Sequence, residues 1–188
     1  SFPDISPLHR QMIRWVLGRA DRVLSTSHFM ARHIKNLSGI HSEVTPFGID
    51  TGVFYNQRSG SQNDELVVGS IKNLKPEYSL HHVLHTFKRV RQLLPEQPLR
   101  LMLVGDGSER SRLEQLAHDL EIGEEVEFRG YQPYAGISRY HNMLDIYVNL
   151  PALESFGVSV LEASACERPV VASDTGGLRE TIRDGNTG

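Results

Sequence analysis

From Leu66 onward the sequence repeats one unit, a short apolar run followed by a segment with apolar residues at helical spacing. The expected strands are 66–71, 99–104, 126–129, 146–150 and 169–172, and the helices between and after them start near 79, 108, 137, 157 and 178. Strands that are apolar on both faces and alternate with helices indicate a parallel sheet covered by helices on both sides. We therefore expect an α/β fold with a doubly wound, Rossmann-like parallel sheet.

Functional side chains are expected in the loops that follow these strands. In open parallel sheets, ligands bind beyond the carboxyl ends of the strands, where these loops gather. The candidate loops are those after Ile71, Val104, Arg129, Leu150 and Ala172.

The first 44 residues have a different pattern. Ser6-Pro7 and Ser27 are typical helix starts, and residues 44–50 are expected to form a strand that runs into a turn. The polar tract 55–65 is expected to be a loop. Because the chain opens without Met and closes on a turn-rich string, we expect a fragment. In it, residues 1–44 end an N-terminal lobe and its linker, and residues 45–188 form a second, C-terminally incomplete domain.

The composition excludes several classes of protein. The chain has 188 residues, 39% hydrophobic and 23% charged, as in an ordinary globular domain. A net charge of -3 gives no clustered basic excess for nucleic acid. Cys166 is the single cysteine, and no apolar run approaches the roughly 20 residues of a membrane-spanning helix. We expect a cytoplasmic protein with no nucleic-acid partner.

The most informative stretch runs from Glu154 to Ala163, with two glutamates eight positions apart. Glu154 falls in the loop after a strand, where it can face a ligand, and Gly157 lets a ligand approach the backbone closely. The free amides around Gly157 and Val158, at the positive end of the helix dipole, can hold a diphosphate. Glu162 lies further along the helix, where its carboxylate can accept hydrogen bonds from the hydroxyls of a ribose.

This stretch resembles the E-x7-E motif of the retaining glycosyltransferases of the GT-B fold, the family 4 group. Further resemblance lies in the linker 46–50, in 104–107, in 128–130 and in 169–180. The resemblance implies the C-terminal lobe of a GT-B fold, which binds a nucleoside-diphosphate sugar. In the family the first glutamate contacts the donor sugar, neighbouring amides hold hydroxyls and phosphate, and the second glutamate binds the ribose. These roles fall here on Glu154, on Phe156 to Val158, and on Glu162.

The sequence departs from the family after the first strand of this domain. Ser70 replaces the arginine that grips phosphate, and the sequence is closer to a subgroup with a lysine two residues further on. Lys72 is therefore the candidate phosphate-binding and catalytic cation, with Lys75 as the reserve; either could be a solvated loop charge. The second departure is Glu167, which stands where the family usually ends a helix with glycine.

Two other loops are candidates for contact with the nucleotide. Gly105 and Gly107 are expected to form a tight turn that keeps side chains off the ligand. By resemblance, Arg129, Gly130 and Tyr131 frame the nucleobase through backbone groups, although Tyr131 could equally be a rim aromatic. No Asp-x-Asp occurs, so we expect no divalent metal and no other cofactor.

The expected reaction, by resemblance, transfers a UDP- or GDP-linked sugar to an acceptor with retention, in polysaccharide or glycoconjugate biosynthesis. The acceptor is unknown, with lipid-linked molecules and polysaccharides as candidates. A basic excess in residues 1–35 fits either a peripheral contact with the inner membrane face or the surface of the missing lobe. Two alternatives remain open: a nucleotide-sugar epimerase of the GT-B fold, and a non-catalytic nucleotide-sugar-binding module.

Overall fold

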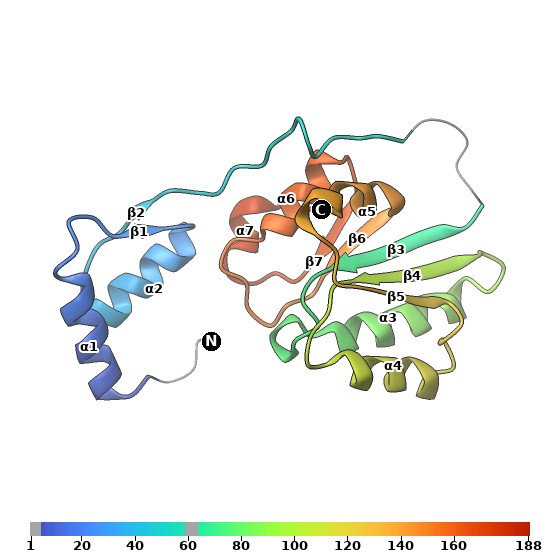
Figure 1. The fold of residues 1–188 in the computed structure, drawn as a ribbon, viewed down its shortest axis with the longest axis horizontal. Helices are drawn as coiled ribbons and strands as arrows, with labels where there is room; N and C mark the ends of the chain where they lie inside the picture. The colour runs from blue at the N-terminus through green and yellow to red at the C-terminus, as the bar shows by residue number, and fades with distance from the viewer. Residues whose placement is uncertain (1–4, 59–63) are drawn as a thin grey trace.

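The computed structural model describes residues 5–58 and 64–188 (Figure 1). Residues 59–63, part of the loop expected over 55–65, lie outside the described residues. The chain begins with a small unit in which two short strands pair in parallel. Its elements are α1 (Pro7–Leu17), β1 (Leu24–Ser25), α2 (His28–Ser38) and β2 (Glu43–Val44).

Both helices of this N-terminal unit begin where the sequence predicts. The Ser6 hydroxyl accepts a hydrogen bond from the His9 amide at 3.4 Å, and the Ser27 hydroxyl accepts one from the Met30 amide at 3.1 Å. Each bond satisfies an amide of the first turn that has no partner within its helix.

The strand expected at the start of 44–50 is short and ends at Val44, and the turn begins at Asp50, whose carbonyl accepts from the Phe54 amide at 2.9 Å. The Thr45 amide still donates to the Ser25 carbonyl at 2.8 Å, but no strand follows it. Pro46 has no N–H with which to continue the ladder, so the strand ends there.

The second part of the chain forms a five-stranded sheet in the order β5-β4-β3-β6-β7, with every neighbouring pair parallel. The strands are β3 (Leu66–Ile71), β4 (Leu99–Val104), β5 (Val126–Gly130), β6 (Ile146–Asn149) and β7 (Val170–Ala172). The chain moves outward from β3 to β5 and then returns to the other side of β3 as β6. Ligand crevices of doubly wound sheets form at such a switch point, which here is the β3/β6 boundary. The predicted sheet is confirmed.

Helices cover both faces of the sheet (Figure 1). α3 (Leu80–Leu93) and α4 (Arg110–Asp119) pack on one face, and α5 (Ile137–Met143), α6 (Val158–Ala165) and α7 (Leu178–Thr181) pack on the other. Both cores are built from buried apolar side chains. On the α5 and α6 face, the polar side chains of His141 and Glu162 are buried as well.

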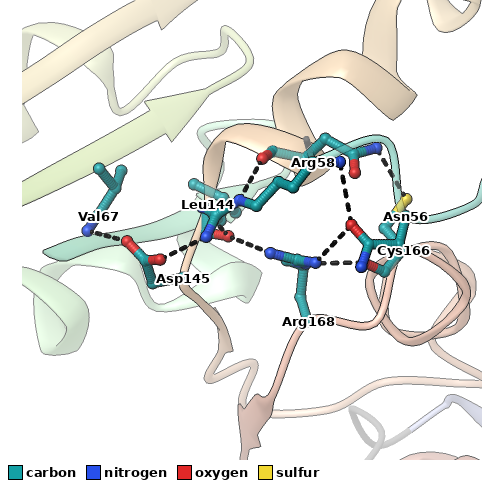
Figure 2. A network of polar contacts seen from close by, with 8 residues as sticks. Asn56, Arg58, Val67, Leu144, Asp145, Cys166 and Arg168 are labelled. Atoms are coloured by element: carbon teal, nitrogen blue, oxygen red, sulfur yellow. Dashed lines mark hydrogen bonds and ion pairs between the residues drawn. The ribbon is translucent and has the colours of Figure 1, made fainter. Parts of the chain in front are cut away.

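The segment between β2 and β3 is bound to α5 and to the end of α6 (Figure 2). Arg58 donates hydrogen bonds to the Asp145 carboxylate at 2.6 Å and to the Leu144 carbonyl at 2.7 Å. Arg168 donates to the same carbonyl at 3.3 Å and to the Asn56 side chain at 3.0 Å. The network fixes residues 56–58 against the end of α5 and the end of α6.

α6 ends at a residue with a left-handed backbone conformation, as the resemblance to the family implies. Glu167 has a φ of 59°, in the region where helices usually place glycine. The Arg168 amide donates to the Ala163 carbonyl at 2.9 Å and closes the helix end. A side chain in this conformation costs about 1 kcal/mol, so the glutamate weakens the helix end without removing it.

None of the helices in residues 5–58 and 64–188 has the length and apolar character needed to cross a membrane.

Candidate functional site

The loops after β3 and β6 meet at the switch point of the sheet. Lys72 is the first residue after β3, and Glu154 lies between β6 and α6. Lys72 Nζ lies 2.8 Å from Glu154 Oε2, and the two side chains are only 13% and 14% exposed. Charges as shielded as these attract each other more strongly than pairs at the surface. The structure therefore brings together the two residues predicted to be catalytic.

Tyr78 also contacts Lys72, although the sequence analysis did not select it. Lys72 Nζ lies 4.9 Å from the centre of the Tyr78 ring, within the range of a cation–π interaction. Burial, followed by the charges of Glu154 and Glu77, raises the pKa of Tyr78 above its ordinary value. The ring therefore stays neutral and forms a wall beside the ammonium. Lys75, the reserve cation, is exposed at the start of the 3-10 turn η1 (Pro76–Tyr78).

Gly105 and Gly107 lie against the backbone of the Lys72 loop. A Cβ at Gly105 would overlap the Lys72 carbonyl, and a Cβ at Gly107 would overlap the Leu74 carbonyl. Gly105 also has a φ of 134°, which side chains rarely allow. Both glycines are therefore required by the close approach of two backbone segments. Their predicted contact with the nucleotide stays a prediction.

A second pair of glycines supports the Glu154 loop in the same way. A Cβ at Gly176 would overlap the Glu154 carbonyl, and a Cβ at Gly177 would overlap the Ser155 carbonyl. The Gly177 amide also donates to the Glu154 carbonyl at 2.8 Å. Each charged loop is thus backed by glycines from the turn after a neighbouring strand.

Contacts from the N-terminal unit reach the Glu154 loop. The Ser27 hydroxyl donates to the Ser155 carbonyl at 2.7 Å. The Glu180 carboxylate accepts hydrogen bonds from the His28 and Phe29 amides at 2.8 and 2.7 Å, so it caps α2. These contacts join residues more than a hundred positions apart, and no local sequence signal predicts them.

Glu162 is buried on α6, with a side chain only 7% exposed. His141 Nε2 lies 3.4 Å from Glu162 Oε2, and the imidazole is fully buried. Burial, followed by the charge of Glu162, raises the pKa of Tyr134 above its ordinary value. A buried carboxylate needs such partners because its desolvation is costly. The sequence analysis selected neither Tyr134 nor His141, since a single aromatic or histidine in a short helix predicts nothing specific.

The start of α6 follows the Glu154 loop directly. Gly157 has a φ of 94°, and a Cβ there would lie 2.5 Å from a methyl group of Leu178. Phe156 is buried, with its ring 5.7 Å from that of Phe47, so it can offer a ligand only its backbone. The Val160 amide donates to the Gly157 carbonyl at 3.0 Å, which leaves the Val158 and Ser159 amides before it without an acceptor within the helix.

Arg129, Gly130 and Tyr131 lie at the end of β5, the edge strand two positions from β3. Arg129 pairs with Glu127 at 2.8 Å, and Tyr131 is 73% exposed. The Gly130 carbonyl accepts from the Gly105 amide at 2.9 Å, which links this end to the Lys72 loop through the Gly105 turn. The predicted contact of these three residues with the nucleobase stays a prediction.

Two other kinds of feature could mark a site: a cluster of metal ligands and a surface hollow. Among the described residues, no group of three or more His, Cys, Asp or Glu side chains could hold a metal ion. Two surface hollows lie beside β7, lined in part by Val170, Asp174 and Gly188. Neither hollow includes Lys72, Glu154 or Glu162. Because Lys72, Glu154 and Glu162 lie outside both hollows, we place the candidate site at the switch point of the sheet.

The fold matches the C-terminal domains of GT-B glycosyltransferases. The crystal structure of HepE from Anabaena in complex with UDP and glucose superposes with a TM-score of 0.79 at 23% identity, over 96% of this chain and 53% of that chain. The family model described as glycosyl transferases group 1 matches residues 54–188. The chain belongs to this family.

Curated relatives support the assignment. The chain is 34% identical over 165 residues to D-inositol 3-phosphate glycosyltransferase of Stackebrandtia nassauensis, covering 77% of this chain and 36% of the relative. It is 28% identical over 191 residues to N-acetyl-alpha-D-glucosaminyl L-malate synthase of Bacillus anthracis, covering 97% of this chain and 49% of the relative. The chain therefore spans half or less of the length of these two relatives.

Proposed function

We propose that this chain is the donor-binding part of a retaining glycosyltransferase, which moves a sugar from a nucleoside diphosphate to an acceptor. The observation that carries the proposal is the Lys72–Glu154 pair at the switch point, with Glu162 buried on the following helix. An ammonium suits a diphosphate, whereas carboxylates suit the hydroxyls of the sugar and the ribose. A nucleotide sugar presents these three groups.

Lys72 and Glu154 neutralise each other across the crevice. A diphosphate carries more charge than a carboxylate, so it competes for Lys72 and leaves Glu154 to the hydroxyls of the donor sugar. When the glycosidic bond breaks, negative charge builds on the departing diphosphate. The ammonium, which still lies beside the Tyr78 ring, meets that charge with little reorganisation, which is the condition for electrostatic stabilisation of a transition state.

The first turn of α6 supplies the second phosphate contact in this proposal. The amides near Phe156, Gly157 and Val158 point out of the helix start, where the dipole favours an anion. Lys72 and these amides together would neutralise the diphosphate without a divalent metal. Glu162 would then bind the ribose, and the end of β5 would border the nucleobase.

Since the chain spans half or less of the relatives' length, we propose that it binds the donor and that transfer needs the remainder of the enzyme. The UDP complex of HepE supports UDP sugars as a first choice of donor, with GDP sugars as the next. A cytoplasmic location, with peripheral attachment at the inner membrane face as the alternative, belongs to the same proposal.

The donor proposal is tested by calorimetry of the 188-residue chain with UDP-, GDP- and ADP-glucose, with and without EDTA. We expect one nucleotide to bind and its affinity to survive chelation. At 100 times its dissociation constant the donor should add about 2.7 kcal/mol to the stability of the fold. Absence of binding by all three donors would overturn the donor role, and a large loss on chelation would overturn the metal-free account.

Retention is tested separately on the complete enzyme. The product should keep the anomeric configuration of the donor sugar, as read from its proton coupling constants. An inverted product would contradict this part of the proposal alone.

A further inference from the structure

Glu162 has one basic partner in its surroundings. Within residues 5–58 and 64–188, the recorded ion-pair contact of Glu162 is His141, with Nε2 lying 3.4 Å from Oε2. Both side chains are shielded from solvent, at 7% and 0% exposure. Because solvent is largely excluded, a hydrogen bond from His141 is stronger here than in water and can orient the Glu162 carboxylate.

The imidazole of His141 packs against two aromatic rings. Its ring centre lies 5.3 Å from that of Tyr147 and 6.1 Å from that of Phe54. Nδ1 is buried and has no hydrogen-bond partner. We assign the hydrogen to Nε2, because a bare Nδ1 lone pair costs less in an apolar setting than an unpaired N–H.

We propose that His141 is a positioning residue, which holds the Glu162 carboxylate in the orientation that binds both hydroxyls of a ribose. The terminal torsion of a glutamate is broad and nearly two-fold, so an unheld carboxylate samples many directions. A bond from His141 to Oε2 restricts that torsion and leaves Oε1 and the second lone pair of Oε2 for the ligand. The pair then selects ribonucleotides over 2′-deoxyribonucleotides. This inference rests on the ribose-binding role proposed for Glu162.

Two substitutions separate positioning from simple packing. In His141→Gln the amide N–H can reach about as far as the original Nε2–H, whereas in His141→Asn it is too short to reach Glu162. Both remove the ring that packs against Tyr147 and Phe54, so they should disturb packing to a similar degree. His118→Gln is the matched control, because His118 is 84% exposed on α4.

The readout is the ratio of dissociation constants for a 2′-deoxynucleotide and its ribonucleotide, measured by calorimetry on each variant. The probes are UDP, GDP and ADP with their 2′-deoxy forms, and each ratio is internal to one protein. We expect a ratio of about tenfold in the parent, as for a lost hydrogen bond to a charged group. The ratio should stay near tenfold in His141→Gln and His118→Gln and fall to about twofold or less in His141→Asn.

The outcomes distinguish this inference from the donor role on which it rests. If Glu162→Ala keeps the parent ratio, or no nucleotide binds, then the proposed ribose role fails and the inference fails with it. If Glu162→Ala abolishes the ratio but His141→Asn keeps it, only the role of His141 is overturned. Equal losses in His141→Gln and His141→Asn would also overturn it. As a check that needs no nucleotide, the imidazole nitrogen chemical shifts should report the hydrogen on Nε2, and a hydrogen on Nδ1 alone would contradict the assignment.

Discussion

The loops after β3 and after β6 each carry one charge of the candidate site, but different parts of the chain hold them. The β3 loop is fixed from within the sheet domain. The Lys72 amide donates to the Val104 carbonyl at 2.9 Å, the Leu74 amide donates to the Asp106 carbonyl at 3.0 Å, and the Leu74 side chain is 1% exposed. Its position is therefore set by neighbouring strands.

The β6 loop depends in part on the N-terminal unit. Besides the Gly177 bond, the Ser155 carbonyl is held by the Ser27 hydroxyl, and Glu180 holds the start of α2 in place. The two loops therefore differ in which part of the chain holds them. We expect the position of Lys72 to be independent of the N-terminal unit and that of Glu154 to depend on it.

The largest expected effect is on the fold itself. Gly105→Ala should lower the free energy of unfolding by about 3 kcal/mol or more, because the new methyl overlaps the Lys72 carbonyl at a strained φ. Gly176→Ala should do the same on the β6 side, through the Glu154 carbonyl. Urea unfolding measures both.

Gly123→Ala is the control for these two variants, since the nearest atom to its new methyl is 3.9 Å away. It should change the unfolding free energy by less than about 1 kcal/mol. If Gly105→Ala behaved like this control, the close backing of the β3 loop would be wrong.

Loss of Lys72 should affect chemistry more than donor binding. In the complete two-lobed enzyme, Lys72→Ala should lower kcat about 100-fold, the size seen when one stabilising donor is removed, while donor affinity falls less. Lys75→Ala should leave both near the parent value. The reverse result, with Lys75→Ala inactive and Lys72→Ala active, would move the cation by one loop turn.

The two glutamates should separate nucleotide from sugar. Glu162→Ala should weaken the free nucleoside diphosphate and the intact donor alike, by about 1.5 to 3 kcal/mol, because a charged hydrogen-bond partner of the ribose is lost. Glu154→Ala should weaken only the intact donor. Calorimetry with the diphosphate and the donor tests this, and equal losses of diphosphate affinity would show that the roles are misassigned.

The smallest expected effect tests the dependence of the β6 loop on the N-terminal unit. Glu180→Ala removes the carboxylate that accepts from the His28 and Phe29 amides, worth about 1 kcal/mol, and should loosen the Ser27 contact with Ser155, although Ser27 still caps the Met30 amide. Hydrogen exchange should then quicken at the Phe156 and Gly157 amides and stay unchanged at Lys72 and Leu74. Equal changes in both loops would remove the contrast between them.

Much of this arrangement could be predicted from the sequence. Where an apolar run ends, the strand ends, and the next residues lie at the carboxyl end of the parallel sheet. The bounds of β3 and β4 follow from such runs, and with them the position of Lys72. The strand expected from Val44 into a turn is shorter than its apolar pattern indicates, because Pro46 cannot continue the ladder. Contacts between distant segments were not predictable. Neither the close approach of Gly105 to the Lys72 backbone nor the pairing of His141 with Glu162 leaves a periodic signal in the sequence.

The central claim is that a nucleotide sugar binds where the loops after β3 and β6 meet. The most direct measurement is a titration of the isotope-labelled chain with UDP-, GDP- and ADP-glucose, followed through the backbone amide resonances. We predict the largest shifts at Lys72, Ser155 and Gly157, with little change at Val171 and Asp174 in the hollow beside β7. Shifts confined to that hollow, with the two loops unaffected, would contradict the account.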